Sequence, residues 1–270
     1  MPSAPSVFSD CKCAFSVVVD YDNQNNQTKV VWAERRPDQV YAEAPVAVNG
    51  DGSIFAITKN NAQVRVFARE GSGDFDLVST IKAPQYYLTP VTLAFSKNPK
   101  SGKSLLVVVW CDQVSEYVVV TAHAVDKTAT ALLGNGTAVQ QLWQYQRQCP
   151  GSSDFDFVVP AALSVSRDGE VIGVGSWGCL GGDRKIASNH SSDGHRHPAI
   201  VGGTRISSTP NMVVLEGWGG TGKPLVSSSV PGQLWAVDAE TVAGETYVAF
   251  ASWSTQDGSI PSQVTTLAFK

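Results

Sequence analysis

Four stretches of this chain repeat one pattern, in which two short apolar segments are joined across a polar turn, and this repetition restricts the folds that are open to it. The pairs occupy 46–57, 91–96 with 105–110, 163–177, and 234–238 with 247–253. One such pair cannot bury both of its own faces, so repeated pairs indicate sheets that stack on one another. We find no long run with the apolar spacing of a helix.

Two further strand-like segments follow each of the first three pairs, and four antiparallel strands make one blade of a β-propeller. These outer segments are 63–68 and 75–81, 117–123 and 139–145, and 212–216 and 225–229. The fourth pair is followed only by 264–269, one strand short. The N-terminal segments 15–20 and 29–34 alternate about a polar turn, which predicts a hairpin. We expect this hairpin to supply the missing strand and so protect the last edge.

The predicted fold class is therefore all-β, a β-propeller of four-stranded antiparallel blades. We expect about four to five blades, as a closed or a partial ring. An N-terminal arm over 1–14 precedes a single propeller domain over 15–270, which carries a long loop insertion at 179–209. A chain of 270 residues with 43% hydrophobic content is long enough for one sizeable core.

Short turn motifs carry a resemblance to known repeats. Asp-Gly turns occur at Asp51-Gly52 and Asp168-Gly169, and an Asp, polar turn, Thr, then Trp pattern runs from Asp22 to Trp32. These motifs resemble the quinoprotein-like and the YVTN or WD40-like β-propeller repeats, and the last resembles a degenerate tryptophan-docking motif. Quinoprotein dehydrogenases generally have a larger ring, and many hold the cofactor against adjacent cysteines. This chain has no Cys-Cys dipeptide, so the resemblance implies the architecture rather than quinone chemistry.

Charge and hydropathy exclude several partners. A net charge of -4 and an isoelectric point near 5.5 give no electrostatic footprint for nucleic acid or anionic membrane. No apolar run approaches the roughly 20 residues that cross a bilayer, so we expect no membrane insertion. The first ten residues lack the basic and apolar regions of a signal peptide.

Three N-x-[ST] sequons favour an extracellular or secretory-pathway protein, with a cytosolic location as the alternative. The candidate glycosylation sites are Asn26, Asn135 and Asn189.

Cysteine positions suggest a crosslink on one face. Cys149 lies in the connection into the third unit, and Cys111 and Cys179 follow the second strands of the second and third units. We predict a disulfide between Cys149 and Cys179, with Cys111 as the competing partner; it would stabilise the fold by roughly 2 to 4 kcal/mol. No Cys-x-x-Cys occurs, which argues against a zinc ribbon.

The face of a propeller that gathers its blade-to-blade connections is the usual ligand face. Trp110, Trp177 and Trp253 each end a second strand and could form an aromatic rim there. The alternative is that each indole packs between blades. Acidic residues assigned to the same face add candidate ligand contacts. They are Asp112 and Asp257, with Glu116, Asp154 and Asp156 as further candidates.

The insertion contains three of the four histidines of the chain. Its candidate metal ligands are His190, His195, His197 and Asp193, with Asp183 nearby. Imidazole and carboxylate groups this close could hold a transition metal. The alternative is a solvated polar insertion, because the spacing matches no established ligand signature and a sequon lies within it.

No nucleophile elbow and no nucleotide-binding loop occurs, and the catalytic residues of any enzyme reading are unknown. We therefore expect a secreted binding or interaction module that takes a carbohydrate, small-molecule or protein ligand at the loop face, without a cofactor. The alternative is a propeller-type metal-dependent hydrolase or lactonase, or a degenerate quinoprotein-like dehydrogenase, in which case a metal ion would be bound. A structural fragment of a larger assembly is a third interpretation.

Overall fold

The computed structural model of the chain describes residues 14–36, 45–59, 62–69, 73–85, 88–112, 117–126, 138–148, 162–175, 212–228, 233–253 and 262–269. All of the regular structure in these ranges is β-strand, as the repeat predicts. No helix in them is long and apolar enough to cross a membrane.

Within the described residues, the strands form three four-stranded antiparallel sheets, one three-stranded sheet and one hairpin, each with its strands in chain order. The hairpin is β1 (Ala14–Asp22) and β2 (Gln27–Arg36). The first blade is β3 (Val46–Val48), β4 (Ile54–Lys59), β5 (Gln63–Ala68) and β6 (Asp76–Lys82). The second blade is β7 (Leu88–Phe95), β8 (Lys103–Asp112), β9 (Tyr117–Asp126) and β10 (Val139–Gln148). The third blade is β11 (Ala162–Val165), β12 (Val171–Gly175), β13 (Met212–Glu216) and β14 (Pro224–Ser228). The fourth blade is β15 (Gln233–Val242), β16 (Glu245–Trp253) and β17 (Gln263–Phe269).

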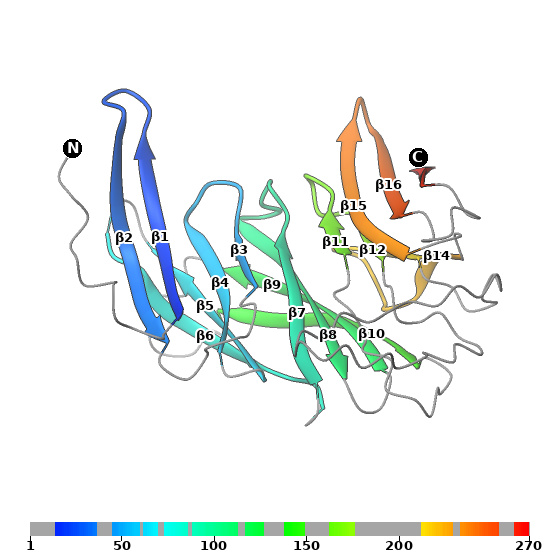
Figure 1. Cartoon of the computed structure of the whole chain (residues 1–270), viewed down its shortest axis with the longest axis horizontal. Helices are drawn as coiled ribbons and strands as arrows, with labels where there is room; N and C mark the ends of the chain where they lie inside the picture. Colours follow the sequence, from blue (N-terminus) through cyan, green and yellow to red (C-terminus); the bar gives the residue numbers. More distant parts are fainter. Residues whose placement is uncertain are drawn as a thin grey trace, which may run out of the picture.

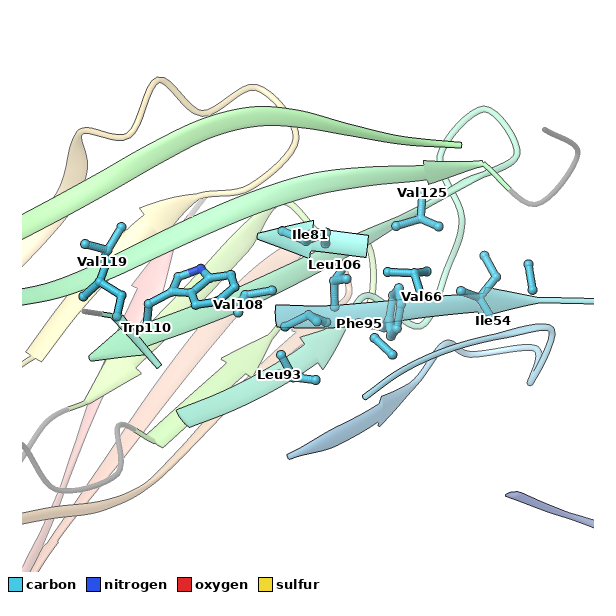
Figure 2. Close-up of a cluster of buried hydrophobic side chains, with 14 residues drawn as sticks. Ile54, Val66, Ile81, Leu93, Phe95, Leu106, Val108, Trp110, Val119 and Val125 are labelled. Carbon is cyan, nitrogen blue, oxygen red and sulfur yellow. The ribbon is translucent and has the colours of Figure 1, made fainter. Parts of the chain in front are cut away.

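The middle blades are buried on both faces, which explains why strands such as β8 are continuously apolar rather than alternating. In β8, Leu106 and Val108 face a core shared with the first blade, whereas Leu105 and Val107 face a core shared with the third. Figure 2 shows the first of these cores, where side chains of β4, β5 and β6 meet those of β7, β8 and β9. Stacking of successive sheets therefore supplies the hydrophobic core.

The third and fourth blades approach each other closely at two glycines of β12. A Cβ atom on Gly173 would lie 2.6 Å from side-chain atoms of both Val237 and Val248, and one on Gly175 would lie 3.2 Å from Leu234. Larger side chains in β12 would separate these sheets, so the glycines set their spacing. Met212, Val214 and Phe250 complete this core, among others.

The hairpin does not complete the last blade, so this expectation was wrong. β1 and β2 pair with each other, and β17 belongs to a three-stranded sheet. The hairpin packs instead on the outer face of the first blade, where the Trp32 ring lies 4.9 Å from Phe55 and 5.1 Å from Phe67. Val18 and Trp32 pack on the aromatic side chains of the first blade. That blade follows the hairpin directly in the chain, so packing there closes a shorter loop than pairing with β17 would.

Two ion pairs fix the hairpin on the first blade. The Arg69 guanidinium donates bidentate hydrogen bonds to the Asp20 carboxylate, at 2.8 and 2.9 Å. The Arg65 guanidinium makes a bidentate contact of the same kind with the Glu34 carboxylate. The hydrogen bonds from Arg69 hold the pKa of the Asp20 carboxyl below its ordinary value. Paired N–H donors on a carboxylate specify orientation as well as contact, so they set the angle at which the hairpin docks.

The sheets together form an open arc. In Figure 1 the hairpin stands at one end and the fourth blade at the other, with the three four-stranded blades between them. Of the two ring forms expected, the described residues make the partial one.

Candidate functional site

The arc has two different edges, which we name the turn face and the loop face. The turn face consists of the tight turns that join the two innermost strands of each blade, at 49–53, 96–102, 166–170 and 243–244, and Figure 1 shows these turns on one side. The loop face is the opposite edge, where β8, β12 and β16 end and the next strands begin.

In the turns of the turn face, polar side chains accept hydrogen bonds from the turn itself. The Asp168 carboxylate accepts hydrogen bonds from Ser166 Oγ at 2.7 Å, from the Glu170 N–H at 3.1 Å and from Thr241 Oγ1 at 3.1 Å. Burial opposes ionisation of Asp168, but these hydrogen bonds outweigh it and hold the pKa below its ordinary value. Gly169 follows with a φ of 76°, in the left-handed region that a tight turn requires. The Asp-Gly motifs noted in the sequence are therefore turn-forming elements.

Charged side chains from three blades meet on the turn face. Glu240 of the fourth blade accepts a 3.0 Å hydrogen bond from Arg167 of the third and lies 3.6 Å from Lys97 of the second. The hydrogen bond from Arg167 lowers the pKa of Glu240. Lys100 and Glu170 add a further pair at 2.7 Å between the second and third blades. Because these groups are partly exposed, each pair contributes little stability, and their role is to align neighbouring blades.

The chemistry of the turn face is structural. The carboxylate of Asp168 accepts a hydrogen bond from its own turn, and those of Glu240 and Glu170 accept hydrogen bonds from a neighbouring blade. Within the described ranges no group of three His, Cys, Asp or Glu side chains is placed to hold a metal ion. This face therefore joins blades. The ligand-binding residues predicted from the sequence were assigned to the other face.

Trp110 does not contribute to an exposed aromatic rim, and this part of the prediction was wrong. Its side chain is 0% exposed and lies in the core between the first two blades. The indole Nε1 donates a 2.8 Å hydrogen bond to Thr121 Oγ1, which lies 2.9 Å from His123 Nε2. β8 continues two residues beyond Trp110, so the ring lies inside the sheet stack rather than at its margin. The alternative that this indole packs between blades is confirmed.

The other predicted contacts of the loop face fall at or beyond the strand ends. Asp112 is the last residue of β8 and Trp253 the last of β16, so the backbone of both reaches this face. Trp177 and Asp257 lie outside the described residues. The same holds for Glu116, Asp154 and Asp156.

The candidate metal site and disulfide are also outside the described ranges. This applies to Asp183, His190, Asp193, His195 and His197, and to Cys149 and Cys179. Cys111, the competing disulfide partner, is 1% exposed and belongs to the core between the second and third blades. Its side chain packs in one cluster with apolar residues such as Val109 and Val118.

Of the three sequons, one lies in the described structure. Asn26 occupies the exposed tip of the hairpin with a φ of 52°, and its Oδ1 accepts a hydrogen bond from the Tyr21 hydroxyl. Asn135 and Asn189 lie outside the described residues.

The apolar surfaces at the two ends of the arc were not predicted from the sequence. Val17, Val19, Tyr21 and Val30 are exposed on the hairpin, and Trp235, Tyr247 and Val264 are exposed on the fourth blade. The sequence of β1 could have indicated the surface on the hairpin. Apolar residues occupy both alternating positions of this strand, as in strands that are covered on both faces.

Comparisons with known proteins support the architecture. No protein-family profile matches the chain, and no curated protein sequence matches it. Among solved structures, the Dos1 propeller is similar at 9% identity over 94% of this chain and 54% of that one, with a TM-score of 0.51. The β-propeller domain of Cps50 (Swd1) from Myceliophteria thermophila is similar at 10% identity over 88% of this chain and 60% of that one, with a TM-score of 0.47.

An enzyme is also among the similar structures. The GH93 α-L-arabinofuranosidase of Fusarium graminearum is similar at 11% identity over 83% of this chain and 60% of that one, with a TM-score of 0.41. The chain thus spans between 54% and 60% of the length of these three structures. The likeness to the Dos1 propeller, together with the four-stranded sheets, establishes the β-propeller fold that the repeat predicted. At 9% identity it says nothing about the activity of this chain.

Proposed function

We propose that this β-propeller chain is a binding module without catalysis of its own, and that it holds a protein or glycan ligand at the loop face. The observation that carries this proposal is the contrast between the inner turns of the turn face and the connections that leave the loop face. The inner turns of the turn face are short and hydrogen-bonded to one another across blades. The connections that leave the loop face include 149–161 and 176–211, far longer than any inner turn.

Long connections on a rigid frame are the usual place for binding residues, because the frame positions them while their own sequence can vary. Hydrophobic packing makes this frame rigid. Three hydrophobic cores lie between successive blades, and a fourth holds the hairpin on the first blade. Asp112 and Trp253, at the loop-face ends of β8 and β16, would be the contacts closest to that frame.

We further propose that the protein passes through the secretory pathway and carries N-linked glycan. Asn26 supports this, because its sequon lies at an exposed hairpin tip that a transferase could reach. The Cys149–Cys179 disulfide belongs to the same proposal, since an oxidising compartment would let it form. A cytosolic protein would carry neither modification.

The test uses protein secreted from a glycosylating host and probed on a glycan array and against a panel of secreted proteins. One variant replaces 179–209 with a short Gly-Ser linker, and another combines Asp112→Ala with Trp253→Ala. The matched control combines Lys100→Ala with Glu170→Ala on the turn face. We expect both loop-face variants to lose binding of a hit at least tenfold and the control to retain it.

Loss of binding in the turn-face control alone would contradict the assignment of the ligand to the loop face. Metal analysis of the same protein tests the alternative interpretation, a metal-dependent enzyme. About one metal ion per chain, lost in His195→Ala with His197→Ala, would replace the binding-module proposal with a metal-dependent hydrolase.

A further inference from the structure

One arginine of the second blade is partly buried without a bonded partner. Within the described residues, two guanidinium nitrogen atoms are closed to solvent and make no hydrogen bond, Nε of Arg65 and Nη2 of Arg147. The terminal nitrogens of Arg65 bind the Glu34 carboxylate, which neutralises its charge. Arg147 forms no ion pair with a described carboxylate. A guanidinium group stays protonated in proteins, so Arg147 carries a positive charge that no described side chain neutralises.

Strand register places Arg147 at the loop-face margin of the core between the second and third blades. It is the second-last residue of β10 and lies opposite Val118 of β9, which in turn lies opposite Cys111 of β8. Val118 and Cys111 both belong to that core. Cys111 precedes Asp112, the residue with which β8 reaches the loop face. Arg147 therefore lies where two packed blades meet the proposed ligand face.

Tyr145 lies beside Arg147 on the same face of β10. It is opposite Val120, one cross-strand pair further from the loop face, and it packs partly buried against the same core. Burial raises the pKa of the Tyr145 hydroxyl, and the positive charge of Arg147 opposes that rise, so the two groups lie within electrostatic reach of each other. A phenol and a guanidinium group both donate hydrogen bonds. Together they suit an oxygen anion.

The position of Arg147 costs the folded chain stability. A charge that is withdrawn from water without a counter-charge gives up hydration and gains no ion pair in return. Burial also lowers the pKa of the Arg147 guanidinium, for the same reason. A buried polar group without a partner calls for an explanation in a native structure, and residues that break the rules of stability concentrate at functional sites.

We propose that Arg147, with Tyr145 beside it, binds the carboxylate of an aspartate or glutamate side chain of a protein ligand. This rests on the proposed function, in which the loop face holds a ligand, and it favours a protein over a glycan. The reason is burial, because one nitrogen of Arg147 is closed to solvent and the side chain as a whole is only partly exposed. A carboxylate on a slender side chain reaches such a group, whereas a sugar acid carries its carboxylate on a bulky ring.

The first measurement is the midpoint of thermal unfolding of the protein without ligand. Arg147→Met keeps an apolar stem and removes the charge, so it should raise this midpoint by about 2 to 4 °C. Arg69→Met is the matched control, because both terminal nitrogens of Arg69 bind Asp20. It should lower the midpoint by about 2 °C. A lower midpoint in Arg147→Met would overturn the proposal, since it would mean that the chain itself neutralises Arg147.

The second measurement uses acetate as a probe for a side-chain carboxylate. At about 200 mM, sodium acetate should raise the midpoint of the wild-type protein by about 2 °C above sodium chloride at the same concentration. It should not do so in Arg147→Met. Sodium glucuronate should raise the wild-type midpoint by less than half as much. No rise with acetate, or the same rise in Arg147→Met, would overturn the site. An equal rise with glucuronate would overturn the choice of a protein ligand.

A protein ligand from the panel of secreted proteins separates this proposal from the proposed function. Arg147→Met should weaken its binding at least tenfold while the variant stays folded. If Asp112→Ala with Trp253→Ala abolishes binding and Arg147→Met retains it, the loop face is the ligand site and the role of Arg147 is refuted. If binding withstands the loop-face variants, the proposed function fails, and the two thermal measurements still decide whether Arg147 takes a carboxylate.

Discussion

The Trp110 indole Nε1 donates a 2.8 Å hydrogen bond to Thr121 Oγ1 inside the core between the first two blades. Both residues are at most 1% exposed, so water does not replace this bond. The hydroxyl also lies 2.9 Å from His123 Nε2, and the three side chains form a polar chain within an apolar interface. Such a chain is stable only when each member keeps its partner.

Trp110→Phe should lower the free energy of unfolding by about 2 kcal/mol, through the lost hydrogen bond and the smaller ring volume. Chemical denaturation followed by circular dichroism measures this. Tyr21→Phe, which removes an exposed hydroxyl contact, should change stability by less than about 0.5 kcal/mol. A Trp110 variant as stable as the Tyr21 variant would contradict the buried position.

His123 should make stability depend on pH in a defined window. Burial lowers the pKa of its imidazole from 6.5 to about 4, so between these values the unfolded chain binds a proton that the folded chain does not. The free energy of unfolding should therefore fall as the pH is lowered from about 6.5 to about 4, by up to roughly 3 kcal/mol.

His123→Gln should flatten this window, because glutamine does not titrate. The ionised carboxylates affect the free energy of unfolding in a more acid range. The pKa of Asp168 is lowered, so its contribution to stability is lost only as the pH falls below about 4. Denaturation curves at pH 4.5, 5.5 and 7 for both proteins separate the two effects. An unchanged pH profile in His123→Gln would show that His123 is not the titrating group.

Gly50→Ala should destabilise the contact between the first two inner turns. A Cβ atom there would lie 1.8 Å from the Lys97 carbonyl oxygen, a clash with backbone that no side-chain rotation relieves. We expect a loss of about 3 kcal/mol or more. Gly102→Ala is the matched control, because its φ of 76° strains a side chain but the space around it is open, so about 1 kcal/mol should be lost.

The Asn26 sequon should carry glycan in protein secreted from a glycosylating host. Asn26→Gln and Thr28→Ala should each remove one glycan mass, since both destroy the same sequon, and the second leaves the turn residue in place. Intact-mass spectrometry before and after enzymatic deglycosylation measures this. Secreted protein with an unmodified Asn26 would argue against the secretory assignment.

Most of the blade pattern could be predicted from the sequence, because apolar alternation and Asp-Gly turns are local. The inner strands at 105–110 and the outer strands at 117–123 fall within β8 and β9, and Asp168-Gly169 forms the turn expected of it. The shortage of one strand in the fourth blade was also predicted, and among the described residues this blade consists of β15 to β17.

The position of the hairpin could not be predicted in this way. Strand counting shows that an edge lacks a partner, but it does not show which apolar face a hairpin will cover. Val18 and Trp32 pack on Phe55 and Phe67, and this choice depends on a three-dimensional aromatic surface. The burial of Trp110 could not be predicted for a similar reason. A tryptophan near a strand end can either pack between two blades or lie on an exposed aromatic rim.

The N-terminal hairpin stacks on the first blade rather than completing the last one. A double-mutant cycle between Arg65 and Glu34 probes this contact, using Arg65→Ala, Glu34→Ala and the double variant in chemical denaturation. The Arg65 side chain is 12% exposed and meets the Glu34 carboxylate with both of its terminal nitrogens. We predict a coupling energy of about 1 to 2 kcal/mol. A coupling energy of zero would mean that the hairpin does not lie on the first blade in this way.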